Sequence, residues 1–462
     1  MSLSLSSAAT LPSAPPATFA SCPPGSIQAF ATTRGVMAVT AWHSLLWLVV
    51  ANSIGVMIAA MLLVPRINLL LGEWTYGHWM PAHINLQLYG WCSLPLVAFL
   101  FKVYGSDRQP LAAWCSPVLC IWSSALAIGA FSWLKGNSSG KLFLDWTGYP
   151  RVLFPLALLC VWVLLIASLI NEWKLRLNPG ITSRIFKIAG LALLLLVPFL
   201  IYMASSPAIY PPINPDTGGP TGASQLESTL IVIAILLLLP YGMVKRKLKL
   251  SLSLRVAWVI FAAESLLCLC LGRADVSHHR PTQWISLGSL LIWIPLIPLY
   301  YDAFDWHPNT RRWRIAFVCW WAVLVPTGWM LFLPGVLDHF KFTDGLVAHS
   351  LLAMAGFVSS LLIFVMVQLL GDDGWIFNGT WSFYIWHVSV LLYVLIMFYS
   401  GWREGSNPAF SMIPGTLRNS IYALRLIVGI LMLLASLDWF VDSFTLLKEL
   451  RLSASQATLV TR

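Results

Sequence analysis

Long apolar runs separated by short polar segments dominate the chain from residue 36 onward. A helix needs roughly 20 residues to cross the hydrocarbon core of a bilayer, and the runs have about this length. The predicted helices span residues 36 to 64, 83 to 105, 111 to 132, 150 to 170, 185 to 203, 226 to 244, 255 to 271, 283 to 302, 313 to 333, 345 to 368, 376 to 398 and 418 to 440. The pattern therefore predicts a twelve-helix transmembrane bundle without a large soluble domain.

The two ends of the chain differ from this pattern. Residues 1–35 are rich in Ser, Ala and Pro and have neither a basic start nor a long apolar core. We interpret them as a disordered tail rather than a signal peptide. The predicted domains are this tail, a transmembrane domain at 36–445 and a short C-terminal tail at 446–462.

Composition agrees with a membrane protein. Hydrophobic residues make up 58% of the 462 positions and charged residues only 10%, and there are 24 tryptophans. A formal net charge of +10 could indicate nucleic-acid binding, but the basic residues lie in short loops between apolar runs, where they act as topology signals. We exclude nucleic acid as a partner and expect the lipid bilayer.

The distribution of Lys and Arg predicts the orientation. If the N-terminus is cytoplasmic, the inner loops include the basic cluster at 245–255, and the outer loops hold about half as many basic residues. We therefore expect a multi-pass protein of the cell (inner) membrane with both termini in the cytoplasm.

In this topology four histidines share the outer side. His83 lies in "MPAHINLQLYGW", His278 and His279 lie in "VSHHRPTQW", and His349 lies in "VAHSLL". Imidazole is costly in lipid and is a common nitrogen ligand of haem iron and copper. The alternative is that these side chains sit at headgroup level or hydrogen-bond a neighbouring helix. For the four together we favour the ligand interpretation.

These motifs, in their order along the chain, resemble the catalytic subunit I of haem-copper oxidases. The nearest branch contains the cbb-type cytochrome c oxidases and the nitric oxide reductases. The resemblance rests on "HHRPTQWISLGSLLIWIPLIP", "AHSLLAMAGF" and "WSFYIWHVSVLLYVLIMFYSGWREG", together with the histidine in the second helix. It covers essentially the whole chain after the tail and implies the twelve-helix fold of that subunit.

The resemblance also implies ligand roles. His83 matches the ligand of a low-spin haem, His349 matches the proximal ligand of a high-spin haem, and His278 and His279 match two of three copper ligands. It further implies one or two b-type haems, with copper doubtful.

Two expected ligands are absent. The second histidine of the helix 345 to 368 pair falls on Leu351, and the third copper histidine should lie near Ser224 or Gln225. Copper held by two histidines could accept water as a third ligand, or the histidine pair could be metal-free in a solvated loop. Met80 or Met354 could supply a thioether to the iron, although each has the alternative of an ordinary packed methionine.

Four other side chains need an interpretation. Glu264 lies near the middle of the helix at 255 to 271, where a carboxyl is expensive, and could carry protons toward a haem site or simply hydrogen-bond a neighbouring helix. We interpret His387 as a satisfied core histidine. We assign no cofactor role to His43 and His307.

Two functions follow from the resemblance. The first is an oxidoreductase subunit that takes electrons from a cytochrome c or a quinol, with possible additional oxidase subunits, and reduces oxygen or nitric oxide in a modified form. The second is a non-catalytic descendant that binds haem as a sensing or assembly subunit. A cofactor-free transporter is a weaker third, because we see no repeat halves with paired broken helices.

Overall fold

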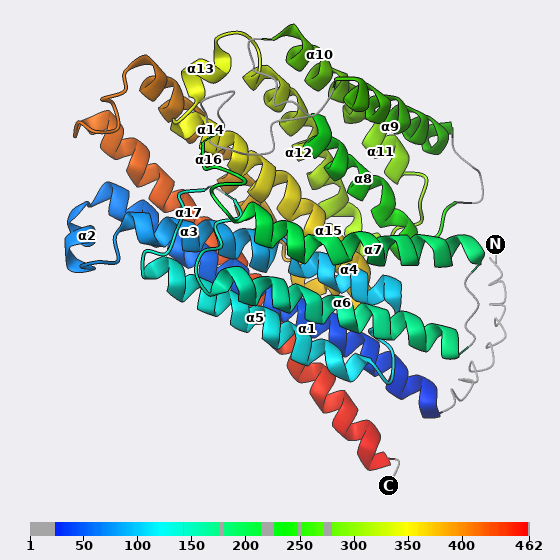
Figure 1. Ribbon diagram of the computed structural model, residues 1–462. Helices are drawn as coiled ribbons and strands as arrows, with labels where there is room; N and C mark the ends of the chain where they lie inside the picture. The colour runs from blue at the N-terminus through cyan, green and yellow to red at the C-terminus, as the bar shows by residue number, and fades with distance from the viewer. Residues whose placement is uncertain are drawn as a thin grey trace, which may run out of the picture.

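The computed structural model describes residues 24–141, 143–175, 180–213, 226–247, 252–271 and 280–460 (Figure 1). The elements are α1 (Pro24–Leu63), α2 (Arg66–Leu70), α3 (Tyr76–Asn85), η1 (Leu86–Trp91), α4 (Leu94–Tyr104), α5 (Ala112–Leu134), α6 (Pro150–Lys174), α7 (Ile181–Ala204), α8 (Leu226–Met243), α9 (Leu252–Leu271), α10 (Pro281–Ser289), η2 (Leu290–Ile292), α11 (Trp293–Tyr301), η3 (Pro308–Thr310), α12 (Arg311–Leu331), α13 (Val336–Phe340), α14 (Asp344–Leu351), η4 (Leu352–Val358), α15 (Ser359–Leu370), η5 (Gly371–Phe377), α16 (Thr380–Ser406) and α17 (Thr416–Val460).

The fold is all-α. Within the described residues, twelve helical segments are long and apolar enough to cross a membrane. Some segments join several elements in one span, such as Tyr76–Tyr104 and Asp344–Phe377. The twelve predicted helices and the class of multi-pass membrane protein are therefore confirmed.

The helix bounds differ from the prediction at several places, of which the second span and the two ends of the chain matter most here. The second span begins at Tyr76 rather than residue 83, because Pro81 lies within the helix without ending it. His83 is therefore about two turns inside the span. At the ends, α1 includes residues 24–35 and α17 continues to Val460. Residues 1–23 of the predicted N-terminal tail lie outside the described residues.

The first and last spans pack side by side. α1 runs along α17, α17 packs against α16, and α16 packs against α14, so segments far apart in the sequence form one side of the bundle (Figure 1). The beginning of α1 and the end of α17 lie at the same end of the bundle. This agrees with an even number of crossings.

Buried tryptophans join these helices. The indole N–H of Trp386 in α16 donates to the Ala355 carbonyl oxygen of η4 at 3.1 Å, and that of Trp439 in α17 donates to Ser382 Oγ of α16 at 3.1 Å. Both side chains are at most 1% exposed. Each indole thus adds a large packed surface and satisfies its own polar atom, which the apolar interior requires.

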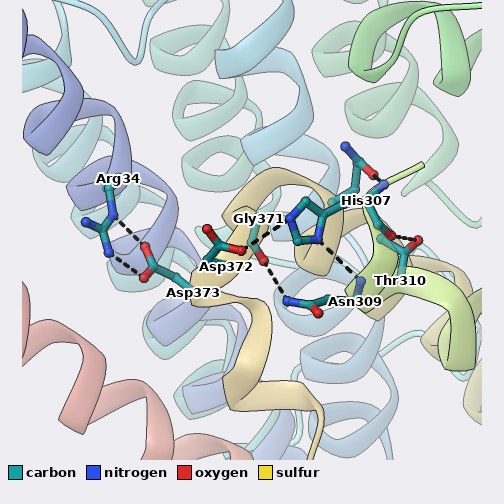
Figure 2. A network of polar contacts seen from close by, with 8 residues as sticks. Arg34, His307, Asn309, Thr310, Gly371, Asp372 and Asp373 are labelled. Carbon is teal, nitrogen blue, oxygen red and sulfur yellow. Dashed lines mark hydrogen bonds and ion pairs between the residues drawn. The ribbon is translucent and has the colours of Figure 1, made fainter. Parts of the chain in front are cut away.

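A polar network closes the end of the bundle where α1 begins (Figure 2). Arg34 forms a bidentate ion pair with Asp373 of η5, with Nε–Oδ2 2.7 Å and Nη2–Oδ1 2.5 Å. In the same network His307 Nε2 lies 3.4 Å from Asp372 Oδ1, and the backbone N–H of Asn309 donates to His307 Nδ1. His307 is thus held by protein groups at this end of the bundle.

Candidate functional site

A cavity of about 760 Å³ lies inside the bundle. One part of its wall comes from α1, α3 and η1, and another from α14, η4, α16 and α17. Cavities that take small molecules and cofactors usually measure about 300–1,000 Å³ and are lined mainly by apolar side chains with a few placed polar groups. The cavity has the size and character of a cofactor site.

His83 is the imidazole on the cavity wall from α3. Its Nδ1 lies 2.7 Å from the carbonyl oxygen of Ala51 in α1. A carbonyl oxygen only accepts, so Nδ1 carries the proton and Nε2 keeps a lone pair. A metal-binding histidine is commonly oriented by such a bond from its other ring nitrogen.

Gly55 makes room for this imidazole. A Cβ at Gly55 would lie 2.8 Å from His83 Cε1, closer than side chains normally approach. The absence of a side chain on α1 therefore lets the ring pack against the α1 backbone while it donates to Ala51.

The wall formed by α14 and η4 includes Leu351 and Met354. Leu351, the position where the resemblance expects a second haem ligand, lies on the same cavity as His83. Both η1 and η4 are π-helices, and Trp91 Nε1 of η1 donates at 2.8 Å to Oγ of Ser359, the residue of α15 that directly follows η4. π-Helical turns often occur at functional sites.

The cavity ends in a charged group of side chains. Arg425 Nη1 lies 2.7 Å from Asp344 Oδ2, Ser400 Oγ donates to the same carboxylate at 2.9 Å, and Glu404 Oε2 accepts from the Asp344 backbone N–H at 2.7 Å. Arg425 is only 8% exposed, and its Nε has no hydrogen-bond partner among the residues that the structure describes. A buried guanidinium with a spare donor favours a ligand that carries an anionic group.

These residues fit a haem. The cavity offers an imidazole whose Nε2 keeps a lone pair, apolar walls, and the Nε–H of Arg425, unpaired among the described residues, to donate a hydrogen bond to an acidic side group at the polar end. Sequence reasoning missed the pair of Arg425 and Asp344. The signal was present, since an arginine within the apolar run 418 to 440 marks a functional position by default.

His349 also lies in α14, but its side chain faces α12. Its Nδ1 is 3.4 Å from Thr327 Oγ1 of α12, and a Cβ at Gly328 would lie 3.4 Å from its Cε1. Among the described residues that line the cavity, His83 and Leu351 are present and His349 is not. The structure therefore places His349 against α12, away from the cavity that His83 and Leu351 line.

The predicted copper ligands His278 and His279 lie outside the described residues, as do Ser224 and Gln225. Within the described residues no group of three or more His, Cys, Asp or Glu side chains is arranged to hold a metal ion. The copper assignment therefore stays a prediction.

Glu264 is 6% exposed and has a partner. Trp293 Nε1 of α11 donates to its Oε2 at 2.6 Å. The hydrogen bond to a neighbouring helix is therefore present, and the proton-transfer role stays a prediction.

The other two histidines of the apolar runs also have partners. His387 Nδ1 accepts from Trp320 Nε1 at 3.0 Å, but its Nε2 is buried without a hydrogen-bond partner in the described part of the chain. The interpretation of His387 as a satisfied core histidine thus holds for one of its two ring nitrogens. His43 Nδ1 lies 2.8 Å from Ser123 Oγ.

Neither a scan of the sequence against protein-family models nor a search of the curated proteins finds a match. The fold and the cavity define an all-α, multi-pass membrane protein with an internal site lined by the imidazole of His83 and by the buried ion pair of Arg425 and Asp344.

Proposed function

We propose that the chain is a haem-binding membrane subunit of the haem-copper oxidase subunit I type, with a modified ligand set. The observation that carries the proposal is His83: its Nδ1 is engaged by Ala51 and its ring lies on a cofactor-sized cavity whose other end holds Arg425. The order of the histidine motifs along the chain supports the same family.

In this proposal His83 binds the low-spin haem, His349 binds a second, high-spin haem, and His278 with His279 binds copper if copper is present. The bound haem supplies one-electron chemistry, which the amino acids of this chain lack. The chain itself orients the imidazoles, excludes water with apolar walls, and holds a protonatable carboxyl at Glu264.

The proposed activity is electron transfer from a cytochrome c or a quinol to oxygen or nitric oxide, with additional subunits as partners. The distribution of basic residues supports cytoplasmic termini. With that orientation, the end of the cavity at Asp344 faces the outer side, because α14 begins there and α1 begins at the other end.

A second candidate is a non-catalytic haem-binding subunit with a sensing or assembly role. Leu351 favours it, because a leucine on the cavity wall cannot bind iron where the family places a histidine. A haem with one strong axial ligand would be a poor relay for fast electron transfer.

The test is an absorption spectrum of the purified protein, oxidised and dithionite-reduced, with a pyridine haemochrome count and a copper analysis. Wild type is expected to carry at least one b-type haem per chain. His83→Ala should lose the haem of the cavity, and His349→Ala should lose a high-spin signal. His307→Ala is the matched control, since His307 lies in the network at the opposite end of the bundle.

Oxygen or nitric oxide consumption with a reduced donor then separates the two candidates. Turnover that depends on His349 supports the oxidoreductase, whereas haem without turnover supports the non-catalytic subunit. A chain that binds no haem, even after titration with haemin, contradicts both.

A further inference from the structure

The cavity contains four methionines, and their positions differ in a way that matters for iron. Met80, Met354, Met397 and Met432 all line it. A thioether can complete the axial coordination of a haem held by one histidine. The question is which sulfur can act opposite His83, and it rests on the proposed function.

Met80 lies on the same wall of the cavity as His83 and so cannot bind iron from the opposite side. It precedes His83 by three residues on α3, so the two side chains lie on one helix face. Two axial ligands approach the iron from opposite sides of the macrocycle, which one face of one helix cannot provide.

Met397 and Met432 are enclosed by helix packing. Met397 in α16 is 1% exposed and Met432 in α17 is 7% exposed. Both belong to the buried apolar core. Moving either sulfur to an iron would open a gap in this packing.

Met354 differs from both. It follows Leu351 by three residues and lines the same cavity from η4, and it is only partly buried. It therefore keeps side-chain surface that the packing of η4 does not cover, on the wall formed by α14 and η4.

Counted from the starts of their helices, Met354 and His83 lie at similar depths. Tyr76 and Asp344 are the first residues of α3 and α14, and both line the cavity. His83 and Leu351 each follow these residues by seven positions, or about 10 Å of helix. Met354 lies about 4.5 Å deeper, and helical side chains lean toward the N-terminus, which brings its sulfur back toward the level of His83.

We propose that Met354 is the second axial ligand of the haem held by His83, so that the lost histidine at 351 is replaced by a thioether one turn further along. The site then has histidine and methionine ligands. Compared with two histidines, this ligand pair raises the reduction potential of the haem.

The test is the spin state and midpoint potential of the haem in purified full-length protein. Met354→Leu changes the volume little, so the chain should fold and retain haem on His83. The expected result is loss of the low-spin ferric signal and gain of a high-spin one, measured by optical and electron paramagnetic resonance spectroscopy as a difference from wild type. Met397→Leu and Met432→Leu are matched controls that should keep the wild-type spectrum.

A second variant tests the same site by adding a histidine ligand. Leu351→His should stay low-spin and show a lower midpoint potential than wild type, because imidazole replaces the thioether. Low-spin haem that survives Met354→Leu, or that is lost with Met397→Leu or Met432→Leu instead, overturns the assignment and leaves haem binding intact. A high-spin haem at His83 in the wild-type protein also overturns the assignment and leaves haem binding intact. Absence of haem from wild type overturns the proposed function together with this assignment.

Discussion

Replacing Arg425 by methionine removes the cation from the most enclosed ion pair on the cavity wall. The side chains of Arg425 and Asp344 are 10% and 16% exposed, and their charged atoms are 2.7 Å apart. Removing one partner of a buried pair costs about 3–5 kcal/mol, because the remaining charge is left without compensation. Asp344 keeps the Ser400 hydrogen bond and lies in the first turn of α14, and both features stabilise a carboxylate.

We therefore expect a cost at the lower end, about 3 kcal/mol in the free energy of unfolding, or roughly a 100-fold change in the unfolding equilibrium. The assay is reversible unfolding of the purified protein in mixed micelles. The double variant Arg425→Met with Asp344→Leu should recover most of the loss, because it removes both charges.

The matched control is the ion pair of Lys341 and Asp338, which is 3.0 Å long but 30% and 36% exposed. Lys341→Met should cost less than about 1 kcal/mol, as half-exposed pairs usually do. The reasoning is refuted if Arg425→Met costs no more than Lys341→Met, or if the double variant is as unstable as the single one.

Three further predictions concern other parts of the bundle. Gly401→Ala should destabilise the protein, because its Cβ would lie 2.0 Å from the α14 backbone, whereas Gly415→Ala meets nothing within 4 Å and should not; thermal unfolding compares the two. Glu264→Leu should cost about 1–3 kcal/mol by leaving the Trp293 indole without its acceptor, and Glu264→Gln should cost less; equal losses in an unfolding titration would contradict this. In the loop after α4, burial raises the pKa of the Asp107 carboxyl above its ordinary value of 3.8, so the folded state binds this proton more tightly than the unfolded state does. The free energy of unfolding of wild type, compared with that of Asp107→Asn, should therefore fall as the pH rises above about 4. A rise of this difference between about pH 4.5 and 7.5 would contradict the prediction.

Only part of the candidate site could be predicted from the sequence. His83 could be singled out because an imidazole in an apolar segment is unusual. The tautomer of His83 could not be predicted from the sequence, because the hydrogen bond to Ala51 joins residues on two helices, 32 positions apart. The ambiguity between Met80 and Met354 had the same origin, since a sequence does not specify which helix faces which.

Sequence by itself determined the class of this protein. Twelve apolar runs, with few charges and with basic residues in short loops, leave little alternative to a multi-pass helical membrane protein, because a bilayer requires each spanning segment to satisfy its own backbone. This signal is local and survives without any knowledge of packing.

Tertiary structure decided the site. The cavity exists because α3 and α14 meet α1, α16 and α17 around one space, and because Arg425 pairs with Asp344 across 81 positions of the chain. Such contacts depend on which helix faces turn inward and at what depth they meet. Hydrophobicity indicates that a helix is in the membrane, but the helices are apolar on nearly every side. Only their packing therefore decides which side chains line the cavity and which face lipid.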